Sequence, residues 1–514
     1  MSHEFRVLVT DKVSDSGLAP LRGDARFELI KIDDSTDPAF AEALPTVHGL
    51  VVRSATKVRA EMLEQATELR VIGRAGVGVD NIDLEGATAR GVAVLNAPAG
   101  NTVSAAELTM ALILSMVRRV AEADASVRRG EWARARFKGG ELRGRVLGLV
   151  GAGRIGGEVA KRCRAFGMRV LVHDPYLTDE RAAALRVERA TLDEVIEGAD
   201  VLSLHVPLTD DTRNMIDGTA LARMKKGSFL VNVARGGAAL DVYGNEPLEE
   251  GSPLRGAPNL VLTPHLGAST AEAQELVATE IAEAVRAALA EGDLTRALNA
   301  PAIGGETLRA LGPLFDLGRQ LGRLGCALAP GGLVGVEIRY AGESEEALRP
   351  LSSYVLMGLL ENILGEEQVN FVSAAHMAKQ RGIGVSRAQF ARHTDYTEFV
   401  EVVVKAERGD LRFAGALLGE THARIVRIGE YHVDIVPAGT LIVLKNHDVP
   451  GVIGRVGTLL GDHEINIAEY HQARQAKGGE ALAAVAVDGD VDAEVREALL
   501  ELDEVSKAVV VRLG

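Results

Sequence analysis

Three glycines, Gly151, Gly153 and Gly156, have the spacing of a turn that binds a dinucleotide. They follow the apolar run 145–150 and precede a helical pattern, so their backbone can approach a pyrophosphate at the start of a helix. Asp174 ends the next apolar run, where a carboxylate can accept hydrogen bonds from ribose hydroxyls and repels a 2′-phosphate. The pattern predicts binding of NAD in preference to NADP. The alternative is a glycine turn that serves packing alone, with a surface aspartate.

The overall charge and the two cysteines narrow the classes of function. A formal net charge of −15 argues against a general nucleic-acid surface, which needs a basic stripe. Cys163 and Cys326 have no neighbours at metal-ligand spacing, so we expect two reduced thiols and no metal site. No run of about 18 apolar residues occurs, and the N-terminus lacks the layout of a signal peptide. We therefore expect no membrane span and a cytoplasmic protein.

Buried strands must position these residues, and short apolar runs supply them throughout the first 270 residues. The runs that we expect to form strands are 6–10, 49–53, 69–73, 92–95, 145–150, 169–173, 201–204 and 228–232. Helical patterns such as 104–119 and 156–166 stand between them. Strands that alternate with helices predict parallel sheets with crossover helices. A break at 97–100 predicts that they form two α/β lobes of the Rossmann-like or flavodoxin-like type.

The rest of the chain predicts two further domains. Residues 306–436 have a mixed α/β pattern without a catalytic motif that we recognise. Residues 440–514 follow the order strand, helix, strand, strand, helix, strand, which predicts a ferredoxin-like βαββαβ unit. A helical stretch at 270–291 is expected to return the chain to the first lobe. The predicted domains are a substrate-binding lobe (1–98 with 270–300), an NAD-binding lobe (99–269), an intervening domain (301–436) and a C-terminal regulatory domain (437–514).

Five motifs occur in a fixed order along the chain. They are 73–83 (Gly-Arg-Ala-Gly-Val-Gly-Val-Asp-Asn-Ile-Asp), 96–101 (Asn-Ala-Pro-Ala-Gly-Asn), the glycine turn 151–156, 232–236 (Asn-Val-Ala-Arg-Gly) and 263–270 (Thr-Pro-His-Leu-Gly-Ala-Ser-Thr). In this combination the chain resembles the D-isomer-specific 2-hydroxyacid dehydrogenases. Within that family, the motif 51–57 (Val-Val-Arg-Ser-Ala-Thr-Lys) and the C-terminal segment resemble the long-form phosphoglycerate dehydrogenases, which have intervening and ACT domains.

The resemblance implies a catalytic trio of arginine, glutamate and histidine. Arg235 corresponds to the arginine that binds the substrate carboxylate, a task suited to the guanidinium fork. His265 corresponds to the acid/base that takes the C2 hydroxyl proton as hydride leaves for the nicotinamide, and Glu246 to the carboxylate that orients the imidazole. The implied reaction is oxidation of D-3-phosphoglycerate to 3-phosphohydroxypyruvate with NAD, the first step of L-serine biosynthesis.

The resemblance also implies contacts with cofactor and substrate. The cofactor contacts are Gly151, Gly153, Arg154, Ile155, Gly156, Asp174, Val233, Ala234, Asp241, His265, Leu266, Gly267 and Ala268. The substrate contacts are Arg53 and Arg134 for the phosphate, with Ser54, Gly76 and Asn101 nearby. The alternative for Arg134 is a solvated charge within the run 132–136.

One segment departs from the family pattern. Family members carry a helix between the arginine motif and the following strand, whereas only the four residues 235–238 separate the two runs here. A parallel crossover needs about a dozen residues or more, although four residues can close an antiparallel hairpin. We therefore expect a helix to be missing between Gly237 and Ala238, with the last strand paired differently or the lobe damaged.

Two alternatives to the implied function follow. The first is the same oxidation of another 2-hydroxy acid, such as 2-hydroxyglutarate, glycerate or glyoxylate. The basic phosphate pocket and the C-terminal segment argue against the enzymes that act on small acids. The second is a catalytically impaired regulatory protein that binds NAD and an amino acid, and the missing helix is the feature that supports it.

The C-terminal segment resembles the ACT domain, which implies an L-serine effector held by Asn446, Asp448 and Asn466. Asp448 offers a charge for the ammonium group, and Asn466 can both donate and accept hydrogen bonds. Asp and Asn beside Pro450 and Gly451 are also ordinary turn formers. The resemblance further implies a small-molecule substrate and a homotetramer, and we expect no nucleic-acid or membrane partner.

Overall fold

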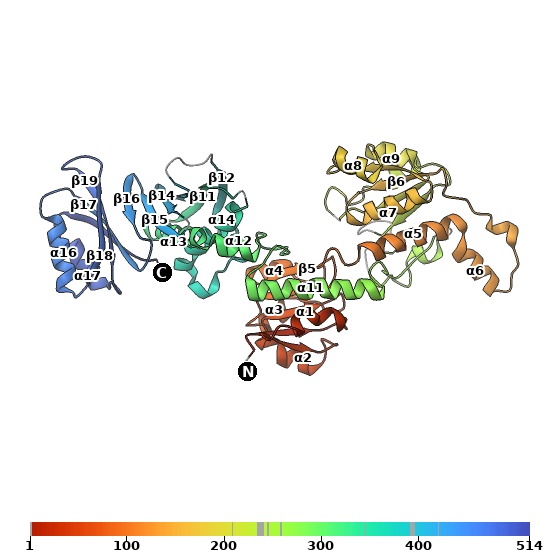
Figure 1. Cartoon of the computed structure of the whole chain (residues 1–514), viewed down its shortest axis with the longest axis horizontal. Coiled ribbons are helices and arrows are strands. Elements are labelled where there is room, and N and C mark those ends of the chain that lie inside the picture. Colours follow the sequence, from red (N-terminus) through yellow and green to blue (C-terminus); the bar gives the residue numbers. More distant parts are fainter. Residues whose placement is uncertain are drawn as a thin grey trace.

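The computed structural model describes residues 3–207, 209–233, 241–243, 246–257, 260–344, 346–390, 396–419 and 421–513. These residues form four β-sheets that are covered by helices (Figure 1). In the view of Figure 1, the first lobe lies at the lower centre, the second lobe at the upper right, and the intervening and C-terminal domains side by side at the left. The predicted fold class is confirmed.

The first sheet contains five parallel strands in the order β2-β1-β3-β4-β5, the flavodoxin-like order. Its strands are β1 (Phe5–Val9), β2 (Phe27–Lys31), β3 (Gly49–Val52), β4 (Val71–Arg74) and β5 (Ala93–Asn96). The helices that follow them are α1 (Ala19–Arg22), α2 (Pro38–Ala43), α3 (Ala60–Gln65) and α4 (Leu84–Ala89). Helices cover both faces, so neighbouring residues such as Val7 and Leu8 pack in different cores. This explains the continuous apolar runs in the sequence.

A long helix from much later in the chain, α11 (Ala271–Glu291), packs on this first sheet. Its Val277, Ile281 and Val285 lie in the same core as residues of β1, β3 and β4. The approach is close, because a Cβ added to Gly73 would lie 2.6 Å from a methyl group of Val285. Together with α5 (Thr102–Arg118), α11 runs between the two lobes (Figure 1).

The second sheet also contains five parallel strands, in the order β10-β9-β6-β7-β8. Its strands are β6 (Val146–Val150), β7 (Arg169–His173), β8 (Glu188–Arg189), β9 (Val201–Leu204) and β10 (Phe229–Asn232). Helices α5, α7 (Arg154–Ala165) and α8 (Asp179–Leu185) cover one face, and α9 (Leu192–Gly198) and α10 (Gly218–Arg223) cover the other. Among the described strands, β10 and β8 form the two edges of this sheet. The expected missing helix falls within 234–240, outside the described residues.

The intervening domain is built on a six-stranded mixed sheet in the order β12-β11-β13-β14-β15-β16. Its strands are β11 (Leu333–Ala341), β12 (Gly384–Gln389), β13 (Glu398–Ala406), β14 (Gly409–Leu418), β15 (His422–Ile428) and β16 (Tyr431–Ile435). Its helices are α12 (Gly305–Ala310), α13 (Gly312–Leu328), α14 (Leu348–Leu364) and α15 (Ala374–Gln380). The sheet is antiparallel except for the parallel pair β11–β12.

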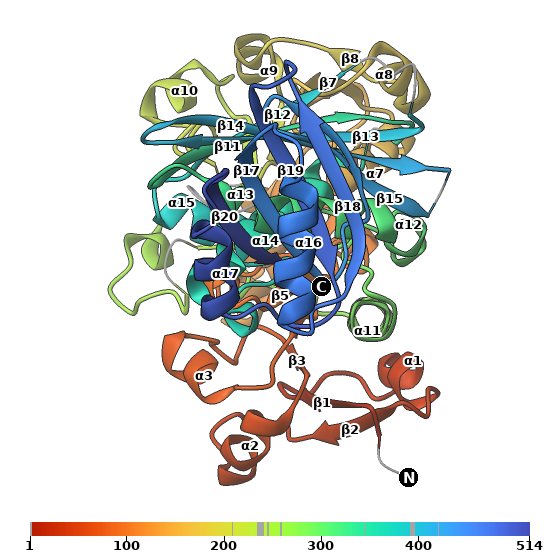
Figure 2. The same ribbon diagram turned by 90° about the vertical axis from the view of Figure 1, so that its left-hand side faces the viewer.

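The C-terminal domain has the predicted βαββαβ order and an antiparallel sheet ordered β18-β19-β17-β20. Its elements are β17 (Thr440–His447), α16 (Val452–Asp462), β18 (Ile467–Arg474), β19 (Glu480–Val487), α17 (Ala493–Leu500) and β20 (Val505–Arg512). Helices α16 and α17 cover one face, which is turned towards the viewer in Figure 2. The other face packs on the intervening domain, with Leu441, Val443 and Leu482 in its core.

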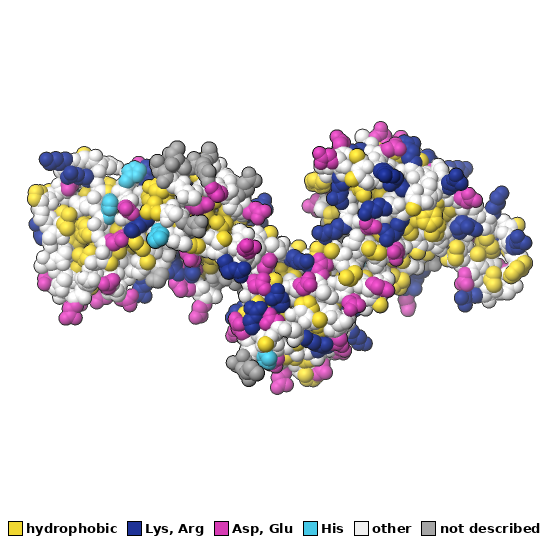
Figure 3. Space-filling view, in the orientation of Figure 1, with side chains coloured by type: hydrophobic (Ala, Val, Ile, Leu, Met, Phe, Trp, Pro, Cys, Tyr) yellow, Lys and Arg dark blue, Asp and Glu magenta, His cyan; other side chains and the backbone are white. Residues whose placement is uncertain are grey.

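Two features are absent from the described residues. No helix among them is long and apolar enough to cross a membrane. They also contain no group of three or more His, Cys, Asp or Glu residues that could hold a metal ion. On the face shown in Figure 3, basic and acidic side chains are interspersed over all the domains.

Candidate active site

The glycine turn joins β6 to α7 in the predicted way. Gly151 has φ +90°, and a Cβ on it would lie 2.5 Å from the carbonyl oxygen of His205. A Cβ on Gly156 would lie 2.1 Å from the carbonyl oxygen of Gly151, so neither position accepts a side chain. Gly153 precedes α7, a helix of 12 residues whose free N-terminal amides can bind a pyrophosphate. Burial lowers the pKa of His205 to about 4, so this histidine brings no positive charge to the turn at neutral pH.

Asp174 lies directly beside this turn. It follows β7, and its carboxylate accepts hydrogen bonds from the backbone N–H groups of Ala152, at 2.8 Å, and Tyr176, at 2.9 Å. These bonds hold a negative charge next to the glycines. The donor set and the cradle without side chains therefore fit a dinucleotide whose ribose carries free hydroxyls. Arg154 and Ile155 form the first turn of α7.

His265 and Glu246 form a pair in the structure. The Nδ1 atom of His265 lies 2.8 and 3.0 Å from the two carboxylate oxygens of Glu246. The backbone N–H of Tyr243 donates to Glu246 at 3.0 Å. All three residues line a cavity of about 380 Å³, together with Thr263. Burial raises the pKa of Tyr243, whose hydroxyl donates to the carbonyl oxygen of Thr263 at 2.9 Å.

Asp241 holds the turn that carries His265. Its carboxylate is fully buried and accepts hydrogen bonds from the Thr263 hydroxyl at 2.7 Å, from Leu266 N–H at 2.7 Å and from Gly267 N–H at 3.1 Å. His265 itself has φ +55°, a left-handed conformation that is uncommon for residues other than glycine. The structure thus shows Asp241 as a support of the histidine turn, which the sequence did not indicate.

Two predicted residues cannot be placed. Arg235, the expected carboxylate-binding residue, and Ala234 lie outside the described residues. Val233 follows Asn232, the last residue of β10, and so stands at the carboxyl edge of the second sheet. Leu266, Gly267 and Ala268 continue the histidine turn towards α11.

The first lobe contributes the predicted residues Arg53 and Gly76 to one small cavity. Arg53, Gly76 and Ala268 line it together, so it joins the first lobe to the histidine turn. Asp11 fixes the backbone here, because its carboxylate accepts from Arg53 N–H at 2.8 Å. Ser54 is exposed and is not among the residues that line this cavity.

Asn101 and Arg134 lie at different ends of α5. Asn101 precedes the first residue of this helix, and its Oδ1 atom is buried without a hydrogen-bond partner in the described structure. Arg134 begins a 3₁₀ turn (Arg134–Phe137), and Arg119 at the other end of α5 donates to the carbonyl oxygen of Arg136 at 2.9 Å. A helix of this length spans about 25 Å. One chain therefore does not bring Arg134 to the other predicted substrate residues.

Arg74 is a candidate substrate residue that the sequence analysis missed. It ends β4 beside Val52, the last residue of β3, so Arg74 and Arg53 lie at adjoining strand ends. Its guanidinium lies over Gly76, where an added Cβ would fall 1.3 Å from Nη1. The signal was available, because the carboxyl ends of neighbouring parallel strands lie at one edge of a sheet.

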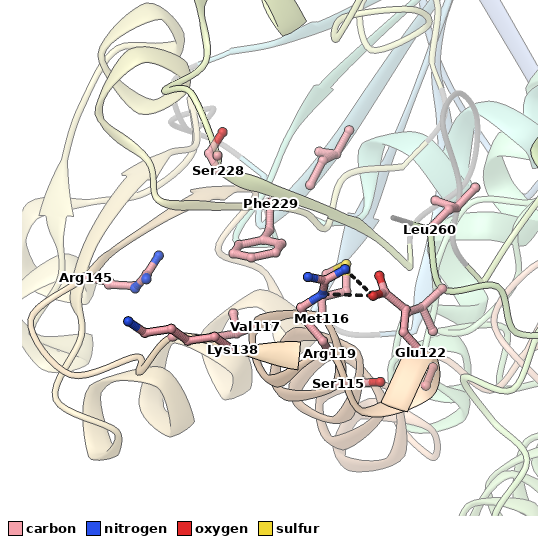
Figure 4. Close-up of a pocket in the computed structure, with 16 residues that line it drawn as sticks. Ser115, Met116, Val117, Arg119, Glu122, Lys138, Arg145, Ser228, Phe229 and Leu260 are labelled. Carbon is pink, nitrogen blue, oxygen red and sulfur yellow. Dashed lines mark hydrogen bonds and ion pairs between the residues drawn. The ribbon is translucent and has the colours of Figure 1, made fainter. Parts of the chain in front are cut away.

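A larger cavity, of about 610 Å³, lies away from this chemistry (Figure 4). It is lined by Gly227–Leu230 at the amino end of β10 and by Leu260 and Val261. Figure 4 shows Arg119 paired with Glu122 on one side, and Lys138 and Arg145 on another. It contains none of the predicted catalytic residues. Since the dinucleotide turn and His265 belong to the carboxyl edge of the sheet, we assign the active site there and not to the larger cavity.

The predicted effector residues are also separated within one chain. Asp448 lies at the carboxyl end of β17 and pairs with Arg474 at 2.7 Å, and this arginine lowers the pKa of Asp448. Asn466 donates to Asp488 at 2.7 Å, at the opposite end of the sheet. The strand between them is eight residues long, so the two sites are about 20 Å or more apart. Asn446 is buried at the end of β17, and its Oδ1 has no hydrogen-bond partner in the described part of the chain.

Three parts of the chain match known families. Residues 110–238 and 236–267 match the NAD binding domain of the D-isomer specific 2-hydroxyacid dehydrogenases. Residues 310–429 match the D-3-phosphoglycerate dehydrogenase intervening domain, and residues 440–504 match the ACT domain. The first match breaks at 236–238, the point where the sequence predicts a missing helix.

Solved structures share the fold of the two lobes. A protein of Thermus thermophilus is 37% identical, with a TM-score of 0.50 over 55% of this chain and 96% of that chain. The D-lactate dehydrogenase of Escherichia coli, in its apo-structure, is 25% identical, with a TM-score of 0.50 over 57% of this chain and 99% of that chain. The matched NAD domain and these folds define an NAD-binding hydroxyacid dehydrogenase.

The whole chain is similar to curated D-3-phosphoglycerate dehydrogenases. It is 38% identical to that of Bacillus subtilis, over 98% of each chain. It is equally identical to that of Archaeoglobus fulgidus, over 99% of this chain and 100% of the relative, and to that of Mycobacterium tuberculosis, over 99% of each. The chain belongs to the D-3-phosphoglycerate dehydrogenase family.

Proposed function

We propose that this chain oxidises D-3-phosphoglycerate to 3-phosphohydroxypyruvate with NAD, the first step of L-serine biosynthesis, and that it acts in the cytoplasm. The observation that carries the proposal is the His265–Glu246 pair, at 2.8 Å, in a chain whose full-length relatives are named for this substrate.

The His265–Glu246 pair determines which nitrogen of the imidazole accepts the substrate proton. The Nδ1–H group of His265 donates to Glu246, so Nε2 is the free acceptor for the proton of the C2 hydroxyl. Glu246 then stabilises the imidazolium that forms. The glycine turn and Asp174 would hold NAD, which would supply the acceptor for the hydride of C2. Arg235 holds the substrate carboxylate through its guanidinium fork.

The phosphate end of the substrate is held by cations at the edge of the first sheet. Arg53 and Arg74 occupy adjoining strand ends there, and Gly76 lines one small cavity with Arg53. In our proposal Ser54 and Asn101 add hydrogen bonds to the substrate on this side. Arg134 reaches the same phosphate only from a second copy of the chain, because in its own chain it lies near the far end of α5. A homo-oligomer, a tetramer in our proposal, therefore completes the site.

Substrate choice is tested by comparing kcat/KM for D-3-phosphoglycerate with that for 2-hydroxyglutarate, which has a carboxylate in place of the phosphate. Arginines suit both anions, but a dianionic phosphate offers three oxygens to two or three guanidinium groups. We expect D-3-phosphoglycerate to be preferred, and Arg53→Ala to reduce that preference. Equal values for the two acids would contradict the assignment.

The impaired regulatory variant is the second candidate, and one observation favours it. The family match breaks at 236–238, beside Arg235. If this connection prevents Arg235 from reaching the substrate, the chain binds NAD but turns over poorly. Normal NADH binding together with kcat at least about 1000-fold below the usual 1–1000 s⁻¹ range would establish this candidate.

The ACT domain suggests how the activity of this chain is regulated. We propose that L-serine binds between two copies, with Asn446 and Asp448 from one and Asn466 from the other, because one chain keeps these residues at opposite ends of its sheet. Serine inhibits if it favours a state with weaker catalysis.

A further inference from the structure

A cavity of about 400 Å³ lies between the intervening domain and the sheet of the C-terminal domain. Its floor is apolar and belongs to both domains. The floor residues are Leu328, Ile428, Tyr431, Val443 and Leu482, each at most 8% exposed. This volume lies in the usual range of pockets for small molecules. The cavity therefore offers a buried apolar surface for a side chain that bridges two domains.

Two lysines lie next to each other among the residues that line this cavity. Lys445 on β17 and Lys507 on β20 face each other directly in the antiparallel register. Both line the cavity, and Arg412 on β14 joins them from the intervening domain. Neither lysine forms an ion pair within the described residues. Like charges directly opposite each other destabilise a sheet, so a carboxylate between these two would remove the repulsion.

Carboxylates lie on the other part of the rim. Glu480 on β19 lines the cavity with Asp410 and Glu430. Burial raises the pKa of Tyr431, and the charge of Glu480 raises it further, which places Glu480 beside the tyrosine on the floor. Three cations and three carboxylates thus surround one apolar floor. Such an arrangement complements a ligand that carries both charges and an apolar group.

We propose that this cavity binds an α-amino acid with an apolar side chain of the size of leucine. The carboxylate lies between Lys445 and Lys507, the ammonium group faces Glu480, and the side chain packs on Val443 and Leu482. The site differs from that of the expected serine effector, because side chains alternate along a strand and Asn446 points to the opposite face of β17 from Lys445. The bound amino acid joins the intervening and C-terminal domains.

Titration calorimetry on the full chain tests the proposal with L-leucine, L-valine and L-phenylalanine. We expect binding of at least one of them. The double variant Lys445→Gln/Lys507→Gln and the variant Glu480→Gln should each weaken it about tenfold or more, as expected for a lost bond to a charged group. Lys405→Gln, on an exposed lysine of β13 outside the cavity, is the matched control and should leave binding unchanged.

Two analogues and one further variant separate the other outcomes. Leucine without its ammonium group (4-methylpentanoate) and leucine without its carboxylate (3-methylbutylamine) should both bind more weakly than L-leucine. Equal binding of 4-methylpentanoate would show a simple anion site and overturn the proposal. Binding that survives the double lysine variant but is lost in Asn466→Ala would place the amino acid at the edge of the ACT sheet and also overturn it. No binding of the three amino acids would do the same.

Discussion

The His265–Glu246 pair depends on one buried carboxylate. His265 has a left-handed backbone, which costs on the order of 1–3 kcal/mol. Asp241 accepts three hydrogen bonds from the turn around it, each worth about 1.5 kcal/mol or more to a charged acceptor. These hydrogen bonds offset the strain of the turn. The sequence motif marks the histidine, but only the structure shows what holds its turn.

At the residue scale, we expect Asp174 to decide the choice between NAD and NADP. Asp174→Ala should raise the Kd for NADH and narrow its preference over NADPH, because the charge that repels a 2′-phosphate is gone. Asp174→Asn removes the charge but keeps an oxygen that can accept the hydrogen bond from Ala152 N–H, which is 2.8 Å long in the structure. This variant therefore separates the effect of the lost charge from the effect of a disrupted glycine turn. Fluorescence titration with both cofactors measures it, with Asp179→Ala, an exposed acid on α8, as the control. Equal Kd values for NADH and NADPH in the unaltered chain would refute the role.

At the scale of elements, the sequence predicted the two parallel sheets well. Strands such as β6 and β9 are buried on both faces, so they occur as continuous apolar runs that end at recognisable turns. The βαββαβ order of the C-terminal domain was equally visible. These elements and the glycine turn are local in sequence, which is why a single sequence reveals them.

Other features depend on contacts between distant residues and could not be predicted. The sheet of the intervening domain contains the buried acids Glu398 and Glu401, which are paired with Tyr340 and Arg339 on β11. Such a strand does not have a simple apolar pattern. The distance between Arg134 and Asn101 could not be predicted from the sequence either, because it follows from the length of α5 and the path of the chain after this helix.

The connection after β10 can be tested at the scale of elements. Insertion of a helix of family length between Gly237 and Ala238 should raise the melting temperature and the affinity for NADH, because it supplies the crossover that four residues cannot form. Differential scanning calorimetry and NADH titration measure the two effects. A Gly-Ser linker of the same length at the same point is the control and should raise neither. If the helix insertion changes nothing, the lobe has accommodated the short connection.

At the scale of the whole molecule, the two sites that we propose need residues that one chain keeps apart. Asp448 and Asn466 lie at opposite ends of the ACT sheet, and Arg134 lies away from the substrate lobe. A symmetric oligomer brings such residues together across its interfaces. The C-terminal sheet also packs its apolar face on the intervening domain, so its ligands are best studied in the full chain.

L-serine should therefore bind only to the oligomer. Calorimetry on the full chain should show heat at millimolar L-serine, and Asn466→Ala should abolish it. Light scattering on the same samples should show a tetramer. Asp462→Ala, an exposed acid at the end of α16, is the control. Serine that binds a monomer with full affinity would contradict the shared site.

The activity of the purified chain is the most direct test of the proposed function. Initial rates of NADH oxidation with 3-phosphohydroxypyruvate should show turnover. His265→Ala should lower kcat by about 100-fold or more, the scale for loss of a general acid/base, and should change the Kd for NADH far less than it changes kcat. Turnover by the unaltered chain that His265→Ala retains would contradict the role of the pair. No turnover by the unaltered chain, with NADH still bound, would contradict the proposed dehydrogenase function itself.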